Sequence, residues 1–193
     1  MNYCTLDEIK EELKITSEDK DNILQSIIEQ VKEFIDGECK RHFDTETATA
    51  KYYDGTGSLL FIDDLVLIDV GGLVLDEDGD GTYESTMATT DYILYPLNRY
   101  PKTMIEINSN GAYSGFANGV RKGVKITGTW GYAATVPKPI RRAAIMLTCR
   151  LFKRRDTAYA TVVASTELGK FEVFRGMDAD TQAMLNPFIR RGF

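Results

Sequence analysis

The stretch that decides the fold is VKITGTWGYAATVPKPIRRAAIMLTCRLFKRR, residues Val124–Arg155, because a strand gives way to a helix within it. Residues 124–130 are rich in β-branched and aromatic side chains, which predicts a strand. Pro139 suits the first position of a helix, where its missing N–H is no loss. One face of that helix is apolar and carries Ile140, Ala143, Ala144, Leu147, Leu151 and Phe152. The stretch therefore joins a β subdomain to a helical one.

Two helices are predicted before this stretch. Thr5 and Glu8 match a capping box, in which each side chain accepts a backbone N–H, and they start a short helix that ends near Lys14. Polar residues 17–21 mark the start of a longer helix. Its apolar stripe comprises Ile23, Leu24, Ile27, Ile28, Val31, Phe34 and Ile35. We expect a core helix that ends within residues 37–43.

Short β-type runs separated by turn signals fill residues 46–130. The predicted strands are Lys51–Tyr53, Leu59–Ile62, Leu65–Val70, Leu73–Leu75, Tyr92–Tyr95, Met104–Ile107 and Val124–Trp130. Asp-Gly, Gly-Gly and Asn-Gly pairs between them are typical of hairpin turns. Short strands at this spacing predict an antiparallel sandwich or barrel.

The fold class that follows is α+β. An N-terminal helical hairpin and C-terminal helices form a small bundle from residues 1–45 and 137–193. The antiparallel β-sandwich or barrel-like subdomain of residues 46–136 is inserted into this bundle.

The C-terminal part is less regular. Residues 156–170 are weakly patterned, and we expect a mobile loop or a segment that a partner orders. Residues 171–175 follow as a short strand and residues 178–185 as a short helix. The tail after them combines aromatic residues with arginines, which is typical of a docking peptide; packing on its own domain is the alternative. The docking candidates are Leu185, Pro187, Phe188, Ile189, Arg190, Arg191 and Phe193.

Composition limits where the protein works. No apolar run approaches the ~20 residues that a membrane-spanning helix needs. The acidic start lacks the profile of a secretory signal, so we expect an intracellular protein that does not engage a membrane. Cys4, Cys39 and Cys149 lie far apart and form no CxxC pair. We expect three buried free thiols and neither a disulfide nor a zinc site.

The net charge of −6 conceals a segregation along the chain. Residues 1–38 hold four lysines and eleven acidic residues, a net charge of −7, whereas residues 137–193 hold eleven basic and five acidic residues, a net charge of +6. Two explanations remain open. Either the terminal helices neutralise one another within a chain, or the acidic part of one subunit meets the basic part of the next.

The basic helix supplies the candidate subunit-interface residues, which are Arg141, Arg142, Arg150, Lys153 and Arg154. Together with Arg155, this cluster would also suit contacts with phosphates. The chain as a whole is acidic, however, and no aromatic stacking pattern accompanies the cluster. Sequence-specific DNA binding is therefore not expected.

An acidic loop offers the best candidate for a metal site. Asp76, Asp78 and Asp80 precede Gly81 in the order of the first half of a calcium loop. The twelfth position holds Met87 where a bidentate glutamate belongs, and the flanks read as strands. We expect an acidic hairpin turn without a cofactor. A calcium-dependent binding module is the alternative function that the loop leaves open.

Residues for catalysis are scarce. Asp63, Asp64 and Asp69 would suit a two-metal nuclease, but adjacent side chains on a strand point to opposite faces. His42 is the only histidine, and no serine or cysteine nucleophile has recognisable partners. A structural role is therefore favoured over an enzyme.

In order and spacing, these features resemble the head–tail connector (adaptor or neck) proteins of tailed bacteriophages. The segments that carry the likeness are Thr5–Lys10, Cys39–Phe43, Asp91-Tyr92, Tyr95-Pro96, Ile126–Tyr132, Val136–Ile140, Arg154–Asp156 and Leu185–Arg191. They span almost the whole chain. The sizeable β insertion departs from the minimal, all-helical members of the family.

The resemblance implies a structural virion protein of the neck, assembled in the host cytoplasm. It implies a ring, expected to be twelvefold, between the portal protein and the tail or stopper protein, with the C-terminal segment engaging the portal. Double-stranded DNA would pass through the ring without sequence recognition. An acidic channel would repel the DNA backbone and keep it mobile, and the excess of acidic residues before residue 137 favours such a channel.

Overall fold

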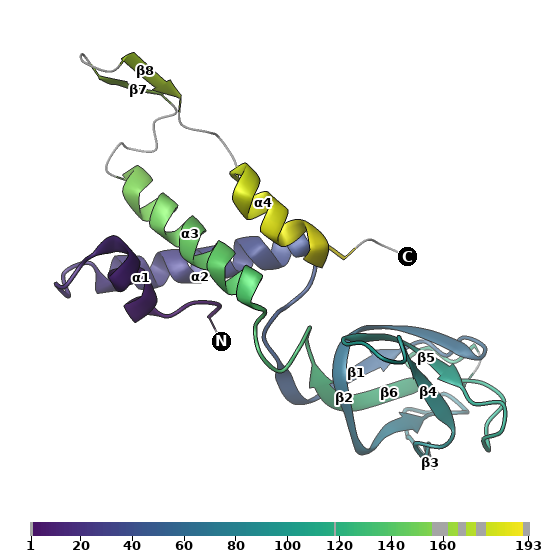
Figure 1. Cartoon of the computed structure of the whole chain (residues 1–193). Coiled ribbons are helices and arrows are strands. Elements are labelled where there is room, and N and C mark those ends of the chain that lie inside the picture. Colours follow the sequence, from purple (N-terminus) through teal and green to yellow (C-terminus); the bar gives the residue numbers. More distant parts are fainter. Residues whose placement is uncertain (1, 118, 156–161, 166–168, 173–176, 191–193) are drawn as a thin grey trace. The chain divides into compact units, whose positions relative to one another are not determined.

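The computed structural model describes residues 2–117, 119–155, 162–165, 169–172 and 177–190. The chain forms two compact units, Met1–Arg41 with Val136–Phe193, and His42–Thr135. Figure 1 shows helices in the first, here called the helical unit, and the large sheet in the second, here called the β unit. Helices and an antiparallel sheet together confirm the α+β class.

The helical unit is arranged around one helix, α3 (Lys138–Arg155), which contacts the three others. The helices are α1 (Leu6–Leu13), α2 (Asp21–Cys39), α3 (Lys138–Arg155) and α4 (Ala179–Leu185), and α4 continues into the 3₁₀ turn η1 (Asn186–Phe188). α3 contacts α1, α2 and α4, and in Figure 1 α1 and α4 lie on either side of it. No helix among the described residues is long and apolar enough to cross a membrane.

Local signals set the helix ends as the sequence predicts. The hydroxyl of Thr5 accepts the backbone N–H of Glu8 at 3.3 Å, and the Glu8 carboxylate accepts the backbone N–H of Thr5 at 2.9 Å. This capping box satisfies N–H groups that the first turn leaves without helical partners. α1 and α2 end at Lys14 and Lys40, whose φ angles of 57° and 53° are left-handed and stop the helix.

The core of the helical unit comes mostly from the predicted stripes of α2 and α3. The buried residues are Leu24, Ile27, Ile28, Val31 and Ile35 on α2 and Ile140, Ala143, Ala144, Leu147 and Phe152 on α3. Ile23 and Phe34 differ from the prediction, because 39% and 47% of their surface is exposed. A stripe of seven residues is wider than the face that α2 turns to its neighbours, so its outer members reach the surface.

The β unit is one open antiparallel sheet. Its strands are β1 (Glu46–Tyr53), β2 (Leu59–Leu75), β3 (Ser85–Thr86), β4 (Tyr92–Tyr95), β5 (Lys102–Ile107) and β6 (Val124–Trp130). They pair in the order β1-β6-β2-β5-β4, and β3 pairs with the end of β2. β1 and β4 do not pair with each other, so the sheet is not closed, and the predicted sandwich or barrel is not confirmed.

The three strands predicted over residues 59–75 are one long strand. β2 pairs with β5 through its first part and with β6 through its second, and the register shifts at 61/65, 65/67 and 68/73. Such bulges bend a strand without ending it. Gly71, with a φ of 68°, lies in the last shift, and a Cβ on Gly72 would lie 2.3 Å from the Thr127 carbonyl oxygen. The Gly-Gly pair that signalled a turn therefore serves a bulge.

The strand of the opening stretch lies at the centre of the β core. Val124, Ile126 and Trp130 of β6 are buried, together with Leu65 of β2 and Ile105 of β5. The indole Nε1 of Trp130 donates to the Thr49 carbonyl oxygen at 2.8 Å, which satisfies its one polar atom.

A separate two-stranded sheet covers part of the segment predicted to be a loop and the first two residues of the predicted strand 171–175. β7 (Val162–Ser165) and β8 (Gly169–Glu172) pair antiparallel. Residues 173–175 of the predicted strand 171–175 lie outside the described residues.

Candidate assembly surfaces of the helical unit

Ion pairs join the acidic helix α1 to the basic helix α3. The Arg141 guanidinium contacts the Glu8 carboxylate at 2.7 Å. One turn further along α1, Glu12 accepts two hydrogen bonds from Arg142, at 3.1 and 3.2 Å. Bidentate pairs of this kind fix geometry, although solvent screening leaves an exposed pair with only a small effect on stability.

These pairs lower the pKa values of the two carboxyl groups. Partial burial acts to raise the pKa of Glu8, but the Thr5 N–H and Arg141 outweigh it, and the net pKa is lowered. The pKa of Glu12 is lowered by the hydrogen bonds from Arg142 and by its charge. Both carboxylates therefore favour the charged form that holds α1 against α3.

A third ion pair joins α3 to α4. Asp178 caps α4, since its carboxylate accepts the Thr181 N–H at 2.8 Å and the Thr181 hydroxyl at 2.9 Å. Arg150 donates at 2.9 Å to Oδ2 of this carboxylate, the oxygen that also accepts the Thr181 hydroxyl. The Thr181 N–H is the main cause of the lowered pKa of Asp178, and Arg150 adds to it.

The structure places all five basic residues that were proposed from the sequence. Arg141, Arg142 and Arg150 pair with acidic groups of their own chain, which is the intramolecular neutralisation that the charge distribution allowed. Lys153 and Arg154 line a hollow at the C-terminal end of α3, which Arg150 also lines.

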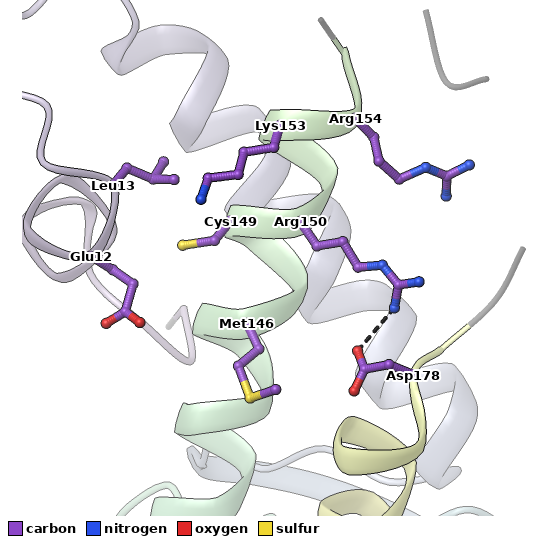
Figure 2. A pocket seen from close by; sticks show the side chains of 8 residues that line it. All are labelled: Glu12, Leu13, Met146, Cys149, Arg150, Lys153, Arg154 and Asp178. Carbon is purple, nitrogen blue, oxygen red and sulfur yellow. Dashed lines mark hydrogen bonds and ion pairs between the residues drawn. The ribbon is translucent and has the colours of Figure 1, made fainter. Parts of the chain in front are cut away.

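Two adjoining hollows follow α3. The first has a volume of about 510 Å³ and is lined by residues of α1, α3 and the start of α4. In Figure 2, Glu12 and Leu13 lie on one side of this hollow and Asp178 lies on the other side, with α3 between them. The second, of about 590 Å³, continues along α3 and α4 to Pro187 and Phe188. Met146 lines both, and the two hollows together are here called the α3 groove.

Sequence reasoning missed the apolar floor of this groove. Met146 and Cys149 are only half-buried, and both line it. Their spacing from Arg142 and Lys153 follows one face of α3, which was the signal available in the sequence. Cys149 therefore differs from Cys4 and Cys39, which are buried as predicted, and all three thiols are free. Burial raises the pKa of Cys4 and of Cys39 to about 11, so neither is a reactive thiolate.

The residues of the predicted docking tail have different surroundings. Leu185 is completely buried, so its side chain anchors α4 inside the helical unit. Pro187 is exposed, and Phe188 and Ile189 are half-buried. The Arg190 N–H donates to the Cys39 carbonyl oxygen at 2.9 Å, which ties the start of the tail to the end of α2. Arg191 and Phe193 lie outside the described residues.

The acidic loop of the β unit is a hydrogen-bonded turn. Asp76 is buried, and its two carboxylate oxygens accept the N–H groups of Gly79 and Gly81 at 2.7 and 2.9 Å. Asp78 and Asp80 cap the backbone in the same way, each at the second following residue. A set of three carboxylates close enough to share a cation consists of Asp76, Asp78 and Glu84, rather than the predicted Asp76, Asp78 and Asp80.

The nuclease candidates do not converge. Asp63 is exposed and pairs with Lys51 at 2.9 Å, whereas Asp64 is buried. Adjacent strand residues face opposite ways, as expected. In the described part of the chain, Asp63, Asp64 and Asp69 do not form a group with metal-binding spacing.

Known proteins match the chain by family and by fold. A family model described as "Phage gp6-like head-tail connector protein" matches residues 3–61. A chain from the neck of an empty GTA particle, computed with C6 symmetry, shares the fold with a TM-score of 0.61 and 14% identity, over 97% of this chain and 90% of that one. A chain from the virion of a native gene transfer agent (GTA) particle aligns with a TM-score of 0.52 and 17% identity, again over 97% and 90%.

No curated protein sequence matches the chain. At identities of 14% and 17% the two structures establish a common fold, and the family match comes from the sequence of α1, α2 and the first strands. Residues 3–61 thus match a head–tail connector family, and the fold of the chain is shared with two chains of GTA particles.

Proposed function

We propose that the protein is a structural component of the neck of a tailed phage or phage-like particle, where it joins the head to the tail. The observation that carries this proposal is the fold shared with a neck chain over 97% of the sequence, in a protein whose residues 3–61 match a connector family. The role is assembly rather than catalysis.

In this proposal, copies of the chain form a ring between the portal protein and the tail or stopper protein. A ring of twelve, as the family resemblance implies, is compatible with the C6 symmetry of the related neck because twelve is a multiple of six. The acidic excess of residues 1–136 favours a channel that repels the DNA backbone and lets it pass. The C-terminal tail docks on the portal.

The acidic loop supports this proposal over the calcium-dependent alternative. Both oxygens of Asp76 already accept backbone N–H groups, and a cation would compete with these bonds. The aspartate side chains of the loop therefore have a structural role, which is to hold the backbone of a turn in the β unit.

A deletion tests the proposal in the particle. In cells that produce the particle, removal of the gene for this protein should leave filled or empty heads and separate tails, because their joint is missing. Expression of the intact chain from a plasmid should restore joined particles. Complete particles in the absence of the protein would contradict a neck function.

A further inference from the structure

α3 has one face that points into the α3 groove, opposite the face that packs on α2. The residues on the groove side are Pro139, Arg142, Met146, Cys149 and Lys153. Their spacing of three to four residues places them on a single stripe. From Pro139 to Lys153 this stripe is about 21 Å long at 1.5 Å per residue. In Figure 2, α1 and α4 flank the groove and α2 lies behind α3.

The groove combines an apolar floor with a basic end. Leu13, Met146 and Cys149 line the hollow near the end of α3, and Met184 and Phe188 line the other. Two of the arginines at its walls are paired within the chain. At the end of the groove near the C-terminus of α3, Lys153 adds a further positive charge to the lining. An occupant of this groove should therefore carry apolar side chains and negative charge.

The outward side of α2 has that character. Its face, here called the α2 outer face, comprises Ile23, Ser26, Gln30, Glu33, Phe34 and Gly37. Ile23 and Phe34 are apolar and 39% and 47% exposed. Glu33 on this face is exposed, as is Glu29 one turn before it, and no lysine or arginine within α2 is exposed. From Ile23 to Gly37 the face is also about 21 Å long.

We propose that the α2 outer face of one subunit seats in the α3 groove of the next. The inference rests on the proposed function, because it names the joint by which subunits of the ring meet. Opposite charge, exposed apolar side chains and equal length support a helix-in-groove contact between two copies. α2 and α3 bury their inner faces against each other, so the two surfaces lie on opposite sides of the helical unit.

This placement determines the kind of assembly. Since the two surfaces are different and point away from each other, one subunit can use both at once, and the contact is heterologous. Heterologous contacts produce a ring when the rotation between subunits closes. The charge segregation of the sequence then has a function both within the chain and between chains.

Disulfide cross-linking tests the joint. Ser26→Cys and Gln30→Cys each place a thiol on the α2 outer face, and the native Cys149 in the groove is its intended partner, since Cys4 and Cys39 are buried. Under conditions in which electron microscopy shows rings, oxidation should yield a ladder of multimers on a non-reducing gel. Cys149→Ser should abolish the ladder. Glu77→Cys, on the exposed acidic loop of the β unit, is the matched control and should give none.

Charge exchange provides a second readout. Glu33→Lys and Lys153→Glu should each reduce the fraction of protein in rings several-fold, and the double variant should recover part of the loss because the pair is restored with its sign exchanged. Glu18→Lys makes the same charge change on an exposed residue outside the α2 outer face and should have little effect.

The outcomes separate this joint from the proposed function. If neither the Ser26→Cys nor the Gln30→Cys variant gives a ladder although rings are present, the α2–α3 joint is wrong and the neck function still stands. If Cys149 in such rings is protected from maleimide, the groove holds another partner and the joint is again wrong. Absence of rings, alone and with the portal protein, would overturn the neck function and the joint together.

Discussion

At the scale of single residues, two glycines differ in the space that surrounds them. A Cβ on Gly72 would lie 2.3 Å from the backbone oxygen of Thr127, whereas a Cβ on Gly37 would meet nothing within 4 Å. The first glycine permits the bulge of β2 against β6. The second only lowers the helix propensity of α2.

Opposite effects on stability are therefore expected from the same substitution. Gly72→Ala should lower the free energy of unfolding by about 1–3 kcal/mol, because backbone must move to make room. Gly37→Ala should raise it by about 0.5–1 kcal/mol. Urea denaturation followed by circular dichroism measures both. A neutral Gly72→Ala would show that the β2–β6 register is wrong.

The acidic loop gives a second prediction at this scale. Millimolar calcium should leave the unfolding temperature of the protein unchanged, because the Asp76 oxygens already accept the N–H groups of Gly79 and Gly81. Differential scanning calorimetry with and without calcium provides the measurement. A rise in unfolding temperature that Asp76→Asn removes would restore the calcium-binding alternative.

At the scale of elements, the helical unit depends on ion pairs between its helices. The pKa values of Glu8, Glu12 and Asp178 are lowered in the folded chain. Groups of this kind stabilise the fold fully above their unfolded pKa of about 4, and the contribution is lost as the pH falls through the lowered values. Acid should therefore weaken the contacts of α1 and α4 with α3.

The expected result is a lower resistance of the helices to urea at pH 3 than at pH 7. Helical circular dichroism during urea titration at both pH values measures the difference. The double variant Arg141→Ala/Arg142→Ala should lose less urea resistance between pH 7 and pH 3, because Glu8 and Glu12 then lack the partners that lower their pKa values. An unchanged pH dependence in that variant would argue against the pairs.

Sequence alone predicted the elements whose signals are local. The capping box of Thr5 and Glu8 and the apolar face of α3 appear where they were expected, since neighbouring residues determine them. Gly71-Gly72 was misread because a bulge and a turn require the same backbone freedom, and only pairing with β6 distinguishes them.

The candidate site was less accessible from sequence. The pairing of Arg141, Arg142 and Arg150 within the chain depends on how α1 and α4 pack beside α3, which periodicity does not give. For the same reason Met146 and Cys149 could not be assigned to a groove, nor Ile23 and Phe34 to the surface. A stripe shows that a helix is amphipathic, but not how much of it neighbours will cover.

At the scale of the whole molecule, the C-terminal tail is expected to join the ring to the portal. Deletion of residues 191–193 should leave a folded protein, because the contact of Arg190 with Cys39 is retained, and should reduce portal binding. Deletion of residues 186–193 also removes η1, so it should abolish portal binding and slightly lower the stability of the helical unit. Co-sedimentation with purified portal protein measures binding, and circular dichroism checks folding. Normal joining of heads by the longer truncation would rule out a docking tail.

The central claim is that this chain works as a ring in a particle neck. Electron microscopy of the purified protein, alone and mixed with portal protein, tests it most directly. We predict closed rings, with twelve subunits or another number compatible with sixfold symmetry, seated coaxially on the portal. A protein that stays a single subunit even when portal is present would contradict the account.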